Sequence, residues 1–84
     1  MPLMFCYFDP FVMQQTVFAV EPNENTPLFE GTMDEVCSLI ASYYATGNYE
    51  RIILTGALAK SAADHIRVYG KINYNLDDIN IEVI

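Results

Sequence analysis

The stretch that decides the fold is GTMDEVCSLIASYYATGNYERIILTG, residues 31–56, which holds one helix pattern followed by one strand pattern. Thr32 and Glu35 form a capping box, in which each side chain accepts a hydrogen bond from the other residue's backbone amide. Gly47-Asn48 then supplies a left-handed helix stop, and Arg51–Thr55 follows as a strand. The helix pattern itself is carried by apolar side chains at helical spacing: Met33, Val36, Leu39, Ile40, Tyr43 and Tyr44.

Three strands are predicted ahead of this unit. Met4–Phe8 is apolar at every position, which predicts a central strand that is covered at least partly on both faces. Thr16–Val20 is β-branched and aromatic, and after a turn cluster at residues 22–25 the segment Pro27–Glu30 predicts a short third strand. Because proline cannot donate to a strand ladder, this third strand belongs at an edge of the sheet.

A second helix is predicted over Leu58–Tyr69, ending at Gly70, and Ile79–Ile84 alternates as a half-buried fifth strand. A meander of three strands followed by two right-handed crossovers predicts an α/β (α+β) fold. Its mixed five-stranded sheet should have the spatial order 3-2-1-4-5. Because both crossovers run in the same direction, both helices should lie on one face, within a single domain over residues 1–84.

Composition argues against several classes of function. Four basic residues against eleven acidic ones give a net charge of −7, which repels phosphate backbones, so no nucleic acid is expected as a partner. No run approaches the roughly 18 apolar residues of a membrane span, and no leader pattern is present, so a cytoplasmic protein is expected. Cys6 and Cys37 lie far apart in the sequence and predict buried thiols, with no metal or cofactor.

The predicted order of elements resembles the ribonuclease-H-like core, which ribonuclease H, resolvase-type nucleases and the actin-like ATPases share. The resemblance is topological and covers nearly the whole chain. The motifs Phe-Asp-Pro at residues 8–10 and Ile-Leu-Thr-Gly at residues 53–56 also resemble small uncharacterised proteins of tailed bacteriophages. This second resemblance implies a viral source, in which case the compartment would be the host cytoplasm.

Five residues should gather at the carboxyl edge of such a sheet, where open α/β sheets bind ligands: Asp9, Glu35, Thr55, Gly56 and Glu82. Ribonuclease-H-like nucleases need three carboxylates there, because two divalent ions must bridge a phosphate. Asp9 and Glu35 match the first two positions, but Thr55 and Gly56 stand where the third would be. The structural interpretation is that Asp9 forms an Asp-Pro turn and Glu35 favours a helix N-terminus.

The segment TGALAKS, residues 55–61, lies between a strand and a helix and ends in Lys-Ser, as a phosphate-binding P-loop does. Leu54 and Ala59 stand where a P-loop needs glycine, so the comparison fails. Gly56 then predicts a tight exit turn into the second helix. His65 is the only histidine and has no metal-ligating neighbour at a suitable spacing, so a structural or solvent-exposed role is expected.

The sheet face opposite the helices should have no helix from this chain to cover it. The first strand is apolar in both of its alternating sets, which are Leu3, Phe5 and Tyr7 on one side and Met4, Cys6 and Phe8 on the other. Ile53 or its neighbours should extend the second of these surfaces. The loop 9–15 is an alternative cover for part of this face.

These observations predict a non-enzymatic interaction or assembly module of viral origin, which binds a second copy of itself or another protein. Of the 84 residues, 52% are hydrophobic, and a core this small cannot easily bury all of their apolar surface. This favours a homo-oligomer. The alternatives are a metal-dependent nuclease and a small-molecule or nucleotide binder at the Asp9–Gly56 edge. The interface candidates are Phe5, Tyr7, Phe8, Phe11, Ile53 and Ile84.

Overall fold

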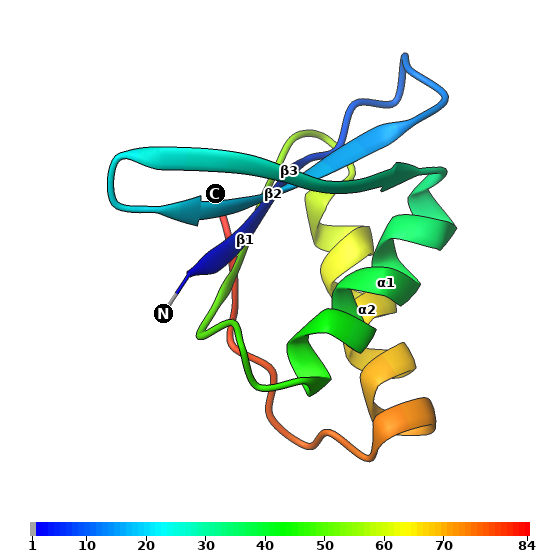
Figure 1. The fold of residues 1–84 in the computed structure, drawn as a ribbon. Helices are drawn as coiled ribbons and strands as arrows, with labels where there is room; N and C mark the ends of the chain where they lie inside the picture. The colour runs from blue at the N-terminus through cyan, green and yellow to red at the C-terminus, as the bar shows by residue number, and fades with distance from the viewer. Residues whose placement is uncertain (1) are drawn as a thin grey trace.

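A computed structural model describes residues 2–84 as one sheet with two helices packed on one side (Figure 1). Along the chain the elements are β1 (Leu3–Tyr7), β2 (Gln15–Glu21), β3 (Glu24–Gly31), α1 (Met33–Ala45), β4 (Ile52–Thr55), α2 (Ala59–Tyr74) and β5 (Ile81–Val83). The strands lie in the order β3-β2-β1-β4-β5. The predicted fold class and strand order are therefore confirmed.

The sheet is antiparallel on one side of β1 and parallel on the other. β1 pairs with β2, and β2 with β3, in antiparallel fashion, whereas the pairs β1–β4 and β4–β5 are parallel. β3 is longer than predicted, because Glu21 already pairs with Glu24 across a two-residue turn. Asn23 takes φ 75° in this turn, as the third residue of a type II turn does after a proline. The edge position of β3 is as expected from Pro27.

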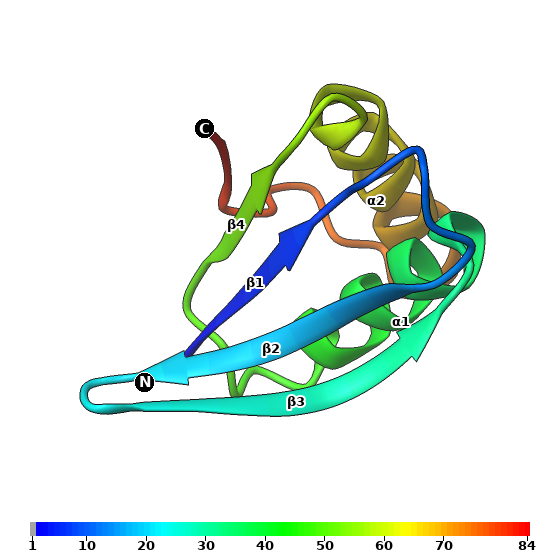
Figure 2. The same ribbon diagram turned by 90° about the horizontal axis from the view of Figure 1, so that it is seen from above.

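Both crossovers place their helices on the same face of the sheet, as Figure 2 shows from above. The capping box of α1 is confirmed: the Thr32 amide donates to Glu35 Oε1 at 3.0 Å, and the Glu35 amide donates to Thr32 Oγ1 at 3.3 Å. The predicted end of the second helix is wrong. α2 runs through Gly70 to Tyr74 and ends at Asn75, which is left-handed with φ 55°.

Gly70 has a packing role that explains why the helix continues through it. It is buried within α2, and a Cβ built on it would lie 2.6 Å from Ile79 Cδ1. Ile79 is itself a core residue of the segment that leads into β5. Because Gly70 has no side chain, the segment that contains Ile79 can pack closely against α2. In the sequence alone, such a packing glycine cannot be told from a glycine that ends a helix.

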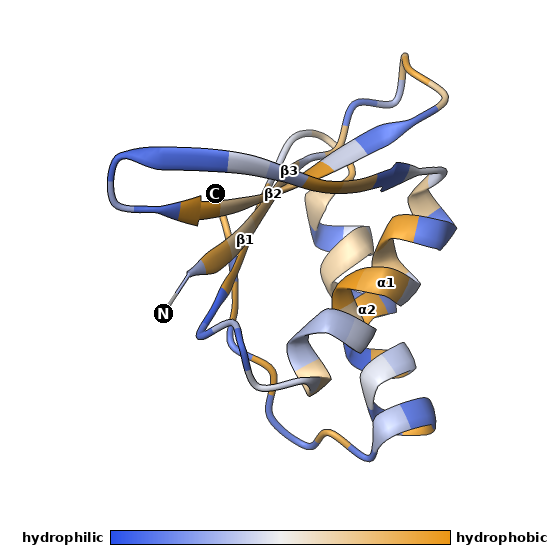
Figure 3. Cartoon of the chain, viewed as in Figure 1, coloured by the Kyte–Doolittle hydropathy of each residue, from blue (hydrophilic) through white to orange (hydrophobic). Residues whose placement is uncertain are grey.

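The core lies between the helices and the sheet face that they cover. From α1 it receives Val36, Cys37, Ile40 and Ala41, and from α2 mainly small alanines and Ile66. Leu39, which was expected on the buried face of α1, is partly exposed instead. Figure 3 shows the apolar colour on β1 and the polar colour at the β2–β3 turn. The sheet contributes Met4, Cys6, Phe8, Val17, Ile52 and Leu54.

Candidate functional site

The loop after β1 takes its shape from Asp9. The Asp9 carboxylate accepts a hydrogen bond from the Phe11 amide at 2.9 Å, which closes a tight turn around Pro10. Gln15, which is buried, accepts from the Asp9 amide at 3.0 Å and donates to the Asp9 carbonyl at 2.9 Å. Asp9 therefore serves the loop's own structure. Sequence reasoning missed Gln15, because nothing in the sequence signals a polar side chain that bridges the base of a loop.

Thr55 and Gly56 are engaged in the packing of strand ends. The Thr55 carbonyl accepts from the Phe8 amide at 2.9 Å, and the Thr55 hydroxyl donates to the Ile84 carbonyl at 3.2 Å. Gly56 takes φ 101°, and a Cβ built there would clash with the Phe8 carbonyl oxygen. Glycine is thus required at this exit turn both by the backbone conformation and by the close approach of β1.

The remaining two edge candidates do not join Asp9 in a ligand site. The Glu35 carboxylate belongs to the capping box, and its hydrogen bonds with Thr32 lower its pKa. Glu82 pairs with Ile53 in register, and its carboxylate lies 3.5 Å from Arg51, which precedes β4. Within residues 2–84 no group of three or more His, Cys, Asp or Glu side chains could hold a metal ion.

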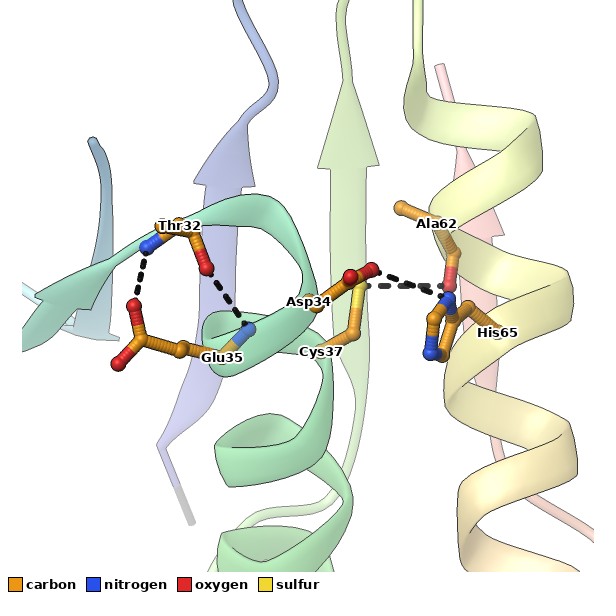
Figure 4. Close-up of polar contacts among 6 residues, drawn as sticks. All are labelled: Thr32, Asp34, Glu35, Cys37, Ala62 and His65. Atoms are coloured by element: carbon orange, nitrogen blue, oxygen red, sulfur yellow. Dashed lines mark hydrogen bonds and ion pairs between the residues drawn. The ribbon is translucent and has the colours of Figure 1, made fainter. Parts of the chain in front are cut away.

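The two helices are joined by polar contacts near their first turns (Figure 4). His65 Nδ1 lies 3.7 Å from an Asp34 carboxylate oxygen, and the His65 ring stacks on Tyr69 with centroids 5.1 Å apart. The Cys37 thiol donates to the Ala62 carbonyl at 3.9 Å. These contacts fit the structural role that was expected for His65.

Both thiols are free and buried, as predicted. Burial, together with the neighbouring Cys37, raises the pKa of the Cys6 thiol to about 12. Burial and the nearby Asp34 carboxylate likewise raise the pKa of Cys37 to about 12. Neither thiol is therefore a thiolate near neutral pH, and neither is suited to act as a nucleophile.

Within residues 2–84, the second face of the sheet has no helix packed on it. Cross-strand pairing places Phe5 beside Phe18 and Ile53, all three only partly buried. No helix of the described chain covers them (Figure 2). Tyr7, two residues after Phe5 on the same side of β1, is 57% exposed. We call this surface the open face and define it by six residues: Leu3, Phe5, Tyr7, Phe18, Val20 and Ile53.

The prediction that the Met4, Cys6 and Phe8 side of β1 forms this face is wrong. Phe8 is fully buried beneath the helices with Met4 and Cys6, so it is a core residue and not an interface candidate. Ile53 pairs in register with Phe5 and so extends the first set of β1 side chains, while its neighbours Ile52 and Leu54 extend the second set. The reason is that a strand apolar on both sides carries no signal for which set the helices will cover, whereas the alternation itself is reliable.

The loop between β1 and β2 does not close the open face. Phe11 is 94% exposed and Met13 is 88% exposed, so neither rests against the sheet. Figure 1 shows this loop projecting away from the helices. Ile84, the last interface candidate, is also exposed, and its amide donates to the Leu54 carbonyl at 2.9 Å, which extends the β5 pairing.

A second, smaller apolar patch lies on the outer side of α2, and sequence reasoning missed it. Ile72 is 75% exposed and Val68 is also exposed, one helical turn away. They line a shallow depression with Asp64, His65 and neighbouring residues of the same helix. Nothing in the sequence signalled this patch, because the helix was predicted to end at Gly70, before Ile72.

Comparison with protein-family models, with curated protein sequences and with solved structures finds no match to this chain. Within residues 2–84 neither helix has the length and hydropathy that crossing a bilayer requires. What the chain does therefore has to be inferred from its own geometry.

Proposed function

We propose that this chain is a non-enzymatic interaction or assembly module, built on a ribonuclease-H-like core, which binds protein through the open face. The observation that carries the proposal is the unpartnered row of Phe5, Phe18 and Ile53 at the centre of the sheet. The strand order and the two crossovers onto one face support the resemblance to the ribonuclease-H-like core.

The open face has the composition of a protein interface. Aromatic side chains are enriched at interface centres, and polar groups surround them. Phe5, Phe18 and Tyr7 supply the aromatic centre, while the Arg51–Glu82 ion pair lies at its β5 side. Burying apolar area in a contact stabilises it by about 25 cal/mol per Å² removed from water. A partner therefore gains most by docking on these central strands.

The local use of the candidate carboxylates favours an interaction role over the nuclease alternative. Asp9 closes its own loop, Glu35 caps α1, and Glu82 lies beside Arg51. A two-ion nuclease would need these groups free and pointing at one phosphate. The nucleotide-binding alternative has no comparable support, because Gly56 packs directly on the end of β1.

The proposal is tested by photo-crosslinking in the native host together with sedimentation of the purified protein. A photoreactive phenylalanine analogue replaces Phe18 on the open face or, as a matched position, Lys60 on α2. We expect one discrete adduct, with a second copy or with another protein, from the Phe18 position only.

The adduct should disappear with Ile53→Asp and persist with Ile72→Asp. These are the same substitution on the open face and on the outer side of α2, where Ile72 is exposed. Tyr7→Ser is a milder open-face variant that guards against a folding defect, since Tyr7 is more than half exposed. A monomer in sedimentation with no adduct at Phe18 would show that the open face is not an interface.

A further inference from the structure

Charge is divided unevenly between the two layers of the molecule. Three of the four basic residues, Lys60, Arg67 and Lys71, belong to α2 in the helical layer. The fourth, Arg51, forms an exposed ion pair with the Glu82 carboxylate at 3.5 Å. Among the described residues, the sheet layer therefore has one basic side chain, and that side chain is paired with a carboxylate.

Acidic residues lie at two borders of the open face, the β3 edge and the end where β1 begins. Glu30 lies on the β3 edge, in register with Thr16 of β2, whereas Glu82 on β5 is paired with Arg51. Glu21 and Glu50 are at the end where β1 begins, and both line one shallow groove. The other residues that line this groove are apolar: Pro2, Leu3, Val20 and Pro22.

This arrangement suits a long basic side chain. The methylene stem of a lysine or arginine packs on apolar surface while its charged head stays in water beside a carboxylate. Leu3 and Val20 offer the apolar surface, and Glu21 and Glu50 offer the carboxylates within the same groove. The central row of Phe5 and Phe18 would take apolar side chains from the same partner.

We propose that the open face binds a protein segment that carries an apolar strip flanked by lysine and arginine. This inference rests on the proposed function and names the partner's chemistry. A second copy of the chain is disfavoured, because it would bring the same acidic border against itself and like charges across an interface are costly. The net charge of −7 adds a long-range attraction for a basic partner.

The test uses two synthetic peptides of equal length, in which the same apolar residues alternate with lysine in one and with glutamate in the other. Binding to the purified protein is followed by fluorescence anisotropy at low salt and at about 0.5 M salt. We expect the lysine peptide to bind, the glutamate peptide not to bind, and added salt to weaken binding. Ile53→Asp should remove lysine-peptide binding, because it places a charge in the apolar row.

Two double variants that remove the same number of charges show whether the lysine peptide binds at the groove of Glu21 and Glu50 or is attracted only by the net charge of the protein. Glu21→Gln/Glu50→Gln should weaken lysine-peptide binding about three- to tenfold, since two exposed charge pairs with the peptide are lost. Asp64→Asn/Asp78→Asn removes the same number of charges from α2 and from the segment between α2 and β5, and should leave binding nearly unchanged. Equal weakening by both double variants would overturn the inference.

The outcome also distinguishes this inference from the proposed function. Self-association that strengthens with salt and is abolished by Ile53→Asp would keep the open face as an interface and overturn the basic partner. Binding of both peptides to the same extent would do so as well. Loss of lysine-peptide binding with Ile72→Asp but not with Ile53→Asp would move the contact to α2 and overturn both.

Discussion

The two faces of the central strands are built from similar residues and have different surroundings. On β4, Leu54 is buried beneath the helices, while its neighbour Ile53 points to the open face and is only partly buried. On β1 the same contrast separates Cys6 from Phe5. Hydrophobicity therefore did not determine which face is covered. Two right-handed crossovers in the same direction did, because they place both helices on one side.

The largest expected effect comes from cutting a side chain on the covered face. Leu54→Ala should lower the free energy of unfolding by about 2 to 5 kcal/mol, because it leaves a cavity in a close-packed core. Ile53→Ala, one residue earlier, should cost about 1 kcal/mol, because a partly exposed site loses less buried area and leaves no closed cavity. Urea unfolding followed by circular dichroism measures both. Equal losses would mean that the open face is covered in solution.

The features of the fold that the sequence predicted are those with local signals. The Thr32–Glu35 capping box and the left-handed stop at Gly47, which takes φ 82°, bounded α1 correctly. The strand order followed from the order of elements. The face assignment of Phe8 failed because it depends on where the crossovers place the helices, and no residue within β1 carries that information.

A second expected effect concerns the segment that returns over α2 to β5. Gly70→Ala should destabilise the protein by about 1 to 3 kcal/mol, as overpacking of a core does. The new Cβ would lie 2.6 Å from Ile79 Cδ1, and Ile79 is buried. This cost opposes the gain of up to about 1 kcal/mol that alanine brings within a helix.

Thermal unfolding of the Gly70→Ala variant decides the sign. A raised midpoint would mean that Ile79 moves aside freely, so that the covered side of the sheet is loosely packed near β5. Combining Gly70→Ala with Ile79→Val, which shortens the opposing side chain, should recover part of the loss. That recovery would not occur if the cost came from the helix backbone.

The candidate site was less predictable than the fold, for a physical reason. Asp9, Glu35 and Glu82 were expected to meet at one edge, but each has a local partner, in Phe11, Thr32 and Arg51 respectively. Strand order alone would bring these carboxylates to one edge of the sheet. Each of them instead forms a hydrogen bond or ion pair with a near neighbour, so they do not form a common site. The sequence predicted that one face of the sheet is left uncovered. Which residues form that face could be learned only from the structure.

A third expected effect is loss of the helix cap that starts α1 over the covered face. Thr32→Ala should cost about 1 kcal/mol, because the Glu35 amide loses the side-chain acceptor that it has in Thr32 Oγ1. Thr32→Ser keeps that acceptor and should restore most of the stability. The midpoint of urea unfolding measures the change. An unmoved midpoint in Thr32→Ala would contradict the capping role.

The smallest expected effect is the dependence of this cap on pH. The backbone hydrogen bond from Thr32, and then the Thr32 side chain, lower the pKa of Glu35 below its usual value. A carboxylate with a lowered pKa in the folded state stabilises the protein above its unfolded pKa, and this stabilisation is lost as the pH falls through the folded pKa. Glu35→Gln keeps an acceptor oxygen but does not titrate.

The difference in unfolding free energy between the natural chain and Glu35→Gln should therefore be constant near neutral pH. It should shrink as the pH falls below about 4.5, since the natural Glu35 then takes up a proton and loses its charge. In a Thr32→Ala background this dependence should be weaker, because one of the two groups that lower the pKa is gone. Because Glu35 is fully exposed, added salt should also reduce the effect. A difference that grows toward acid pH would mean that Glu35 interacts with another charge, and its assignment to the α1 cap would fail.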